Sequence, residues 1–490
     1  MRHSTVHALT LLSLATAAFT LGCTDEKIVY RSGSNFPAPP AAAANFIGYY
    51  DAAAKQTVCG SCHVDFQTRW VSTKHASAWN HLESSGQMQD LCKACHTTNA
   101  LGNAATGTTS GYNSTQDARY HDVQCESCHG AGLTHASSPV ASNRPLASIK
   151  VDVGLQNGCG ECHTGTHEPF VDEWKLSGHS KTRETSHNST EADCQACHTA
   201  QGAILAMGSN ENYVEKSGPM LDVVCATCHD PHGSANSAQL RFSISAANLE
   251  NNLCMRCHQR RGEVAQVTTR NSVHSPEGPT LLGTAGWFPP GMSAADSIIG
   301  THGTQSKNPK LCAGCHVQRF TVNDKATGKF VFQSTGHRFL ATPCVDVNGQ
   351  PTVDQSCTES AMTFRSCVGG GCHGSENAAR SSMTTAELRA ANLIAEANRL
   401  ITLVKAGPRK AECNFPFPGA YTTCNGISFN ANLAGRPGSI IHNPFLVERL
   451  LLASIARVKA DYGVTVSASI NLEPELQRPP RMRAAQGGSR

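Results

Sequence analysis

One short pattern recurs along the whole chain and constrains it more than any other feature. Two cysteines are separated by two residues, and a histidine follows the second cysteine directly. Eight copies keep this spacing, and a ninth has four residues between its cysteines. We number the motifs 1 to 9 in chain order; they are Cys59–His63, Cys92–His96, Cys125–His129, Cys159–His163, Cys194–His198, Cys225–His229, Cys254–His258, Cys312–His316 and Cys367–His373.

This pattern predicts covalent attachment of c-type haem. Two thiols bond the edge of a porphyrin, and the adjacent histidine becomes the proximal ligand of the iron. A zinc ribbon or a thioredoxin-like site also uses paired cysteines, but neither explains a histidine after every pair. The first cysteines are named above, and the second cysteines of the nine motifs are Cys62, Cys95, Cys128, Cys162, Cys197, Cys228, Cys257, Cys315 and Cys372.

Motif 9 departs from the common spacing. Its longer loop contains Gly369, Gly370 and Gly371, which can adopt the backbone angles needed to bring both sulfurs to one porphyrin. The alternative is a plain disulfide loop. The expected cofactor is therefore haem c in nine copies, or in eight if the ninth motif carries none.

The composition indicates a fold that depends on its cofactors. Only 39% of the 490 residues are hydrophobic and 6% aromatic, which is little for a large core. We expect the porphyrins to supply the missing apolar volume, and the chain without haem not to fold. The predicted fold is mainly α with extensive loops and low strand content, with short helices at the motifs and a pair of helices near the C-terminus.

The chain divides into six segments. Residues 1–22 resemble a signal peptide, because an apolar run too short to cross a membrane follows Arg2 and His3. Cys23 follows a small residue, as in a bacterial lipoprotein, although an ordinary signal peptide is the alternative. Residues 23–58 are expected to be a lipidated N-terminus with a Pro/Ala-rich tether. Residues 59–260 hold seven motifs, and 261–377 hold motifs 8 and 9 with a disulfide loop.

The last two segments are a helical part, 378–465, and a disordered tail, 466–490. A capping box at Thr384 predicts one helix to about Lys405, and Asn443 and Pro444 predict a second from Phe445 to about Tyr462. The four cysteines outside the motifs can pair in three ways in an exported chain. Their spacing favours Cys344 with Cys357 and Cys413 with Cys424.

Further histidines are available as second ligands of the irons. Nine of the 23 histidines are proximal, and His3 and His7 lie in the predicted signal peptide. The second ligand decides between electron carriage and chemistry at the iron. Of the remaining twelve, His81 and His187 have no supporting context. The candidate distal ligands are His75, His121, His135, His167, His179, His232, His274, His302, His337 and His442.

The sequence around four of these candidates supports a ligand role. His75 and His179 each follow a tryptophan and a serine in a nearly identical pattern. His135 and His232 come so soon after motifs 3 and 6 that they cannot reach the far side of their own haem, so each should serve a neighbouring haem. His121 and His167 compete for the ninth position.

The chain resembles the multihaem c-type cytochromes, including the tetrahaem cytochrome of nitrifiers and the extracytoplasmic cytochromes of metal-respiring bacteria. The resemblance rests on the segments Val123 to Gly130, Trp174 to His179 and Val224 to Gly233, and on Ile441 to Pro444 before an apolar helix. It covers roughly residues 55–460. It implies low-potential electron transfer by haems with two histidine ligands each.

Three functions are compatible with these features. The first is electron transfer through about nine haems, between redox partner proteins or to an extracellular acceptor, in the periplasm or at the outer membrane. The second is a multihaem reductase or oxidase of a small nitrogen or sulfur compound, which needs one haem with an open distal position. The third is a subunit of a cytochrome filament. We expect an electron carrier without a catalytic residue, and no nucleic-acid partner; the formal charge of +3 decides little.

Overall fold

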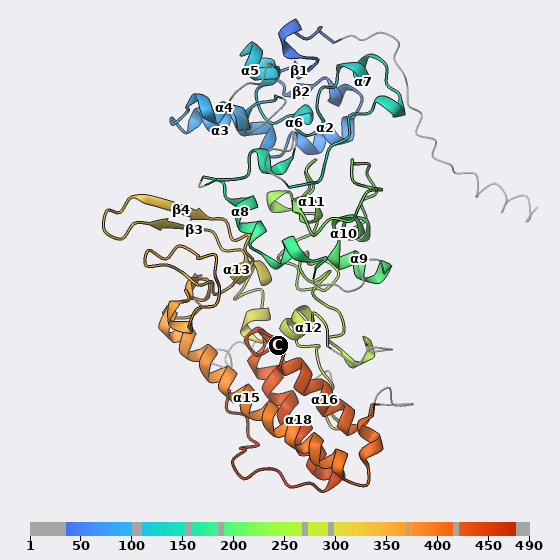
Figure 1. Cartoon of the computed structure of the whole chain (residues 1–490), viewed down its shortest axis with the longest axis vertical. Helices are drawn as coiled ribbons and strands as arrows, with labels where there is room; N and C mark the ends of the chain where they lie inside the picture. Colours follow the sequence, from blue (N-terminus) through green and yellow to red (C-terminus); the bar gives the residue numbers. More distant parts are fainter. Residues whose placement is uncertain are drawn as a thin grey trace, which may run out of the picture.

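The computed structural model describes residues 36–99, 110–151, 158–165, 167–184, 191–266, 273–292, 298–369, 372–414 and 421–476. The predicted signal peptide, Cys23, His187 and most of the predicted tail lie outside these ranges. The fold is mainly α, as expected, with short helices and long loops. The chain runs from the N-terminal motifs at one end of an elongated molecule to three longer helices at the other (Figure 1).

Short helices form at the motifs, as the sequence predicted. The backbone N–H of the motif histidine donates to the carbonyl of the first cysteine in motif 1 (2.9 Å), and motifs 4, 6 and 7 close in the same way. Motif 9 makes this bond too, from His373 to Cys367 at 3.1 Å; Gly370 and Gly371 of its loop lie outside the described residues. The helical turns at the motifs are η2 Cys59–Ser61, α4 Asp90–His96, α6 Cys125–His129, η6 Cys159–Glu161, α9 Ala192–His198, α11 Cys225–Cys228, α13 Cys312–His316 and α14 Arg365–Val368.

Other short helices connect the motifs and cover their sides. The α-helices are α2 Val64–Trp70, α3 Ala78–Ser84, α5 Gly111–Thr115, α7 Leu133–Ser137, α8 Phe170–Lys175, α10 Ala200–Ala206 and α12 Glu277–Leu282. The single 3-10 turns are η1 Ala41–Ala43, η3 His75–Ser77, η4 Ala118–Tyr120, η5 Ala141–Asn143, η7 Gly178–Lys181, η8 Ser237–Gln239, η9 Val264–Gln266, η11 Thr301–Gly303, η12 Glu359–Ala361 and η14 Lys410–Cys413.

The described strands form two small antiparallel hairpins. β1 (Tyr49–Asp51) pairs with β2 (Gln56–Thr57), and β3 (Phe320–Asn323) pairs with β4 (Phe330–Ser334). The second hairpin projects from the side of the molecule (Figure 1). The expectation of low strand content is confirmed.

The predicted tether is shorter than expected. Phe46, Ile47 and Tyr49 are buried, and Phe46 packs in a cluster with Trp79 and Tyr120. Residues from about 41 onward are therefore part of the folded body beside motifs 1 to 3. Composition alone missed this, because a Pro/Ala-rich stretch leads directly into these buried aromatic and aliphatic residues.

The C-terminal helical part contains three long helices rather than a pair. α15 (Glu376–Ala406), α16 (Thr423–Ala434) and α18 (Pro444–Tyr462) pack around one hydrophobic core, and the short α17 (Ser439–His442) precedes α18. α16 was not predicted because most of its residues are buried, so no amphipathic stripe marks it. The prediction for α18 is confirmed, including its left-handed Gly463 cap.

The predicted start of the first C-terminal helix was wrong. α15 begins at Glu376, capped by the side chain of Ser375, and Thr384 lies within the helix. The Thr384 hydroxyl donates to Arg380 O and to Glu359 instead of capping a helix start. A threonine followed three residues later by a glutamate therefore need not mark the start of a helix. Inside a helix, the threonine hydroxyl can donate to the backbone carbonyl one turn earlier.

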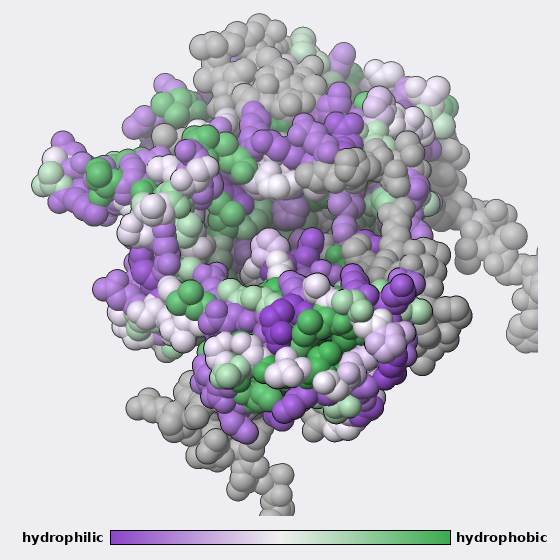
Figure 2. Space-filling model, turned by 60° about the horizontal axis from the view of Figure 1, so that its bottom comes forward, coloured by the Kyte–Doolittle hydropathy of each residue, from purple (hydrophilic) through white to green (hydrophobic). Residues whose placement is uncertain are grey.

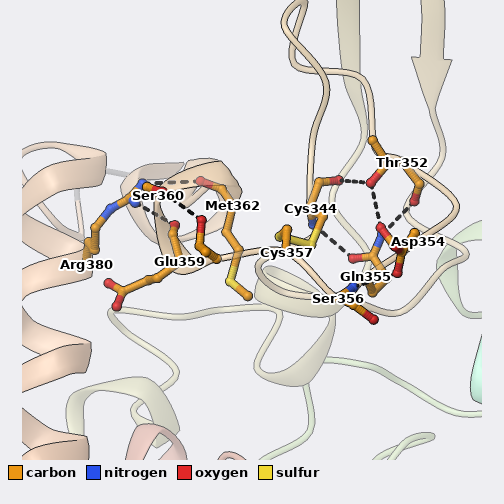
Figure 3. Close-up of a disulfide and its surroundings, with 11 residues drawn as sticks. Cys344, Thr352, Asp354, Gln355, Ser356, Cys357, Glu359, Ser360, Met362 and Arg380 are labelled. Atoms are coloured by element: carbon orange, nitrogen blue, oxygen red, sulfur yellow. Dashed lines mark hydrogen bonds between the residues drawn. A yellow bond between two sulfur atoms is a disulfide. The ribbon is translucent and has the colours of Figure 1, made fainter.

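Both predicted disulfides are confirmed, Cys344–Cys357 and Cys413–Cys424. The first closes a loop in which Thr352 and Gln355 hydrogen-bond the backbone of Cys344 (Figure 3). Arg380 of α15 donates to the carbonyls of Glu359 and Met362 beside it, which ties this region to the C-terminal helices.

No helix in the described ranges is both long and apolar enough to span a membrane. Figure 2 brings the C-terminal end forward and shows a largely polar face with a patch of hydrophobic residues among polar ones.

Candidate haem-binding sites

Eight of the nine motif histidines face one other histidine, with ring centres 6.0–6.4 Å apart. The partner always comes from outside the motif. The pairs are His63 with His135, His129 with His232, His163 with His75, His198 with His274, His229 with His337, His258 with His179, His316 with His442, and His373 with His302.

This separation fits two imidazoles that share one metal ion. An imidazole nitrogen binds a first-row metal at about 2.0–2.1 Å, and adding about 1.1 Å from nitrogen to ring centre on each side gives about 6.2–6.4 Å. Rings packed directly on one another lie closer, as His121 and Trp79 do at 3.7 Å. The paired rings therefore leave room for an iron between them.

His96 of motif 2 is the exception. Within the ranges that the structure describes, no second histidine ring faces it. His121 instead stacks on Trp79, and both His81 and His167 are exposed. The two sequence candidates for the ninth position, His121 and His167, are thus not brought to any motif histidine.

The outer ring nitrogens of many of these histidines bind neutral acceptors, which fixes their tautomer and aims Nε2 at the iron position. His129 Nδ1 lies 2.7 Å from Pro145 O, and His229 Nδ1 lies 2.7 Å from Ala238 O. Similar contacts join His96 to Ala78 O, His198 to Thr182 O, His316 to Phe339 O, His302 to Ile441 O, His135 to Asn143 Oδ1 and His337 to Thr335.

Burial keeps several of these rings neutral. It lowers the pKa of His163, His179, His337 and His442 to about 4, with a smaller contribution from neighbouring histidines. An imidazole must be neutral to donate its lone pair to a metal. These rings are therefore ready to bind iron at neutral pH.

The eighteen motif cysteines form no disulfide, and thiols of different motifs lie near one another. Each such pair brings together the sites where two porphyrin edges would be attached. The thiols that shift each other's pKa most strongly are Cys59 with Cys125, Cys95 with Cys162, Cys159 with Cys225, Cys197 with Cys257 and Cys254 with Cys312. Thiols close enough for their charges to interact are Cys128 with Cys159, Cys228 with Cys257, and Cys315 with both Cys367 and Cys372.

Arginines line two cavities beside the motif cysteines. A cavity beside Cys315 is lined by Arg338 and Arg365, and Nη1 of Arg338 is buried without a hydrogen-bond partner. A second cavity, about 270 Å³, lies beside Cys197 and Cys257 and is lined by Arg256 and Arg260. A guanidinium pairs well with a carboxylate, but the propionates lie on the porphyrin edge opposite the thioether bonds, so the partner here would be a propionate of a neighbouring haem. Sequence analysis did not find these arginines, because no motif marks them.

The pattern shared by His75 and His179 has a structural reason. The Trp70 indole N–H donates to Val123 O at 3.0 Å, and the Trp174 indole N–H donates to Val223 O at 2.8 Å. Val123 and Val223 each lie two residues before a motif. The same contact therefore recurs in two parts of the chain, and each tryptophan anchors the segment that carries a paired histidine.

Two family models match parts of the chain. The family described as cytochrome c554 and c-prime matches residues 58–130, which contain motifs 1 to 3. The family described as a doubled CXXCH motif matches residues 218–263, which contain motifs 6 and 7. Neither the curated proteins nor the solved structures include a significant match. The repeated motifs, the facing histidines and these two matches agree: the chain is a multihaem c-type cytochrome.

Proposed function

We propose that the protein transfers electrons through nine covalently bound haems, eight of them ligated by two histidines. The observation that carries this proposal is the set of eight histidine pairs at the separation that an iron requires. Bound haem supplies a one-electron iron couple, and two histidine ligands leave no position on the iron for a substrate. The chain's own contribution is to hold the ligands neutral, oriented and close to the next site.

The thiol contacts support an order for the electron path. We number each haem by its motif. The contacts join haems 1, 3, 4, 6, 7, 8 and 9 into one continuous series. Haem 2 is attached to the series at haem 4 through Cys95 and Cys162, and haem 5 at haem 7 through Cys197 and Cys257. Haems 2 and 5 are therefore side branches.

The proposed setting is extracytoplasmic respiration, in which the ends of the array exchange electrons with partner proteins or an extracellular acceptor. Cys23 is the proposed lipid anchor, at the outer membrane or another membrane face. A Cys23→Ala variant should then move to the soluble fraction. Wild-type protein that is already soluble would contradict the anchor but not the electron-transfer function. Self-assembly into a filament is a further possibility that the intact complex in solution would reveal by its mass.

Intact mass and electron paramagnetic resonance of the oxidised holoprotein test the main proposal. We expect a mass with nine haems and low-spin signals from eight of them. A mass with eight haems would remove the ninth site and favour a disulfide between Cys367 and Cys372. Several high-spin irons would overturn the assignment of the histidine pairs as ligands.

One observation favours a second function at haem 2. His96 is the motif histidine that no second histidine ring faces in the described part of the chain, and its Nδ1 is 2.7 Å from Ala78 O, so its Nε2 is directed to the iron position. An iron held by His96 alone can bind a small molecule. We propose that haem 2 is this open site, where the array delivers electrons to a small nitrogen or sulfur compound.

The same spectrum tests the second function. One high-spin ferric signal should be present, and added cyanide should convert it to a low-spin signal. A protein in which all irons are low-spin at rest would contradict the open site. In that case His121→Ala and His167→Ala variants would show which of these two histidines moves to ligate haem 2, because only the correct variant would create a high-spin signal.

A further inference from the structure

Haems 4 and 7 occupy equivalent places in the proposed path. The Cys159–His163 motif contacts Cys125–His129 of haem 3, Cys225 of haem 6 and Cys95 of side haem 2. The Cys254–His258 motif contacts Cys228 of haem 6, Cys312 of haem 8 and Cys197 of side haem 5. Each therefore joins two neighbours in the series and one side branch, so each is a junction.

The proximal histidines of the two junctions differ in what their outer nitrogen contacts. His258 Nδ1 lies 3.3 Å from Glu277 Oε2. Glu277 is in the first turn of α12, directly after Pro276. His163 Nδ1 is buried and has no hydrogen-bond partner in the described ranges. Glu168 acts on His163 without a hydrogen bond to it, and Glu161 is buried inside the same motif. Of the two junction histidines, only His258 has a carboxylate in contact with its outer nitrogen.

A carboxylate behind a metal-bound imidazole changes the metal. The carboxylate accepts the N–H proton and makes the ligand more basic, and a more basic ligand stabilises the ferric state over the ferrous one. The negative charge adds to this effect, because an arriving electron is repelled by it. Both contributions lower the reduction potential of the iron that His258 would hold.

A second acidic group near an axial histidine is neutralised by cations. His232 Nδ1 lies 3.5 Å from both Glu211 and Asp230. However, Arg69 pairs with both carboxylates, and Arg241 lies 3.9 Å from Asp230. In the described ranges Glu277 pairs with His258 and with no lysine or arginine, although the charge of His442 also acts on it. Arg256 acts at Cys257 and Arg260 at Cys197, the thiols of haems 7 and 5.

We propose that Glu277 lowers the potential of haem 7, so that haem 7 is an uphill step in the series. Haems 1, 2, 3, 4 and 6 then form one electron reservoir, haems 8 and 9 form another, and haem 5 is joined to both only through haem 7. An electron crosses between the two reservoirs only by occupying the junction backed by Glu277. This inference rests on the proposed electron-transfer function.

Spectroelectrochemistry of the Glu277→Gln holoprotein tests the proposal. A His179→Met background marks haem 7, since a methionine ligand gives that haem a distinct absorption and a raised potential. In this background Glu277→Gln should raise the equilibrium constant for reduction of haem 7 by about tenfold. For a one-electron couple this is a rise of about 59 mV in its potential. Glu277→Asp should restore part of the effect.

Glu387→Gln is the control for loss of one negative charge. Glu387 is exposed on α15, and the charge that acts on its pKa is Glu359 rather than a group of motif 7. The control should change the potential of haem 7 by only a small fraction of the shift expected for Glu277→Gln. An unchanged potential in Glu277→Gln, with nine haems and low-spin signals retained, would overturn this inference alone. Loss of haems or of low-spin ligation in the wild-type protein would instead overturn the proposed function on which it rests.

Discussion

His442 faces His316 with ring centres 6.2 Å apart, although one ends α17 and the other closes motif 8 far earlier in the chain. The start of α18 holds His442 in place. The Asn443 side chain caps that helix by accepting the Leu446 N–H at 3.1 Å, and it donates to Thr280 O and Ile298 O. The C-terminal helices therefore supply one member of a histidine pair whose other member lies in the preceding segment.

Replacing a paired histidine by methionine should raise the potential of one haem and leave attachment intact. In His75→Met the affected haem is the one that His163 holds, since these two rings face each other at 6.1 Å. Methionine with histidine raises the potential of a haem above that of two histidines. We expect a shift of at least about tenfold in the reduction equilibrium, about 59 mV, measured by spectroelectrochemistry.

His81→Met is the control for this experiment. His81 is exposed on α3 and makes no ring contact with another histidine in the described ranges. Its variant should keep every potential of the wild type. Equal shifts in the two variants would show that the methionine acts by some route other than ligation of the iron.

Glu173→Gln should loosen the segment that carries His337. The buried Glu173 carboxylate accepts hydrogen bonds from Ser334, from Thr335 and from the His337 backbone N–H at 2.7 Å. An amide cannot accept all of them, so we expect a loss of about 1.5–3 kcal/mol in the free energy of unfolding. The paired variant Glu184→Gln changes an exposed glutamate and should change stability little.

The spectrum of Glu173→Gln gives a second measurement. His337 faces His229 at 6.3 Å, so a loosened segment should let part of the haem 6 population become high-spin. A variant that is destabilised but fully low-spin would show that Glu173 supports the fold without positioning the ligand.

The attachment motifs, the two disulfides and the last helix could be predicted because each is specified within a short stretch of sequence. The expectation that His135 and His232 reach a motif other than the one they follow agrees with where the structure places them, opposite His63 and His129. It followed from chain length alone, since a residue so close to a motif cannot pass around its own porphyrin.

The remaining pairs could not be predicted, because they depend on how separate segments fold together. His75 faces His163 and His179 faces His258, each from a different part of the chain. The sequence around His121 does not distinguish it from the paired histidines. The structure does, because its ring stacks on Trp79 instead of facing another histidine. Glu277 was missed for the same reason, because its role comes from His258, 19 residues earlier.

Removing the Cys413–Cys424 disulfide should destabilise the C-terminal helices. The bond links η14 to the first turn of α16 and closes a loop with a sequence separation of 11. The loop-entropy estimate for that length is about 3 kcal/mol. We expect the Cys413→Ala and Cys424→Ala double variant to unfold at lower denaturant concentration with all haems attached. An unchanged midpoint would mean that packing of α16 alone holds this part.

Glu126 should make the stability of the N-terminal part depend on pH. This buried carboxyl lies inside motif 3 and accepts N–H groups from Ile47, Gly48 and Gly132. Burial raises its pKa to about 7 from an ordinary value of 4.5, although the three backbone hydrogen bonds oppose the shift. A raised carboxyl pKa means that the folded state holds the proton more tightly than the unfolded state.

The direction of the pH dependence follows from this difference in pKa between the two states. The contribution of Glu126 is fully present below pH 4.5 and is lost as the pH rises through 7, a change of about 3 kcal/mol at 1.36 kcal/mol per pKa unit. Glu126→Gln cannot titrate, so its unfolding free energy should lack this decline between pH 5 and pH 8, even if it is lower overall. Denaturant unfolding of both proteins at the two pH values measures the difference. Parallel pH profiles would show that the carboxylate is already charged in the folded protein, with its three N–H partners sufficient to offset burial.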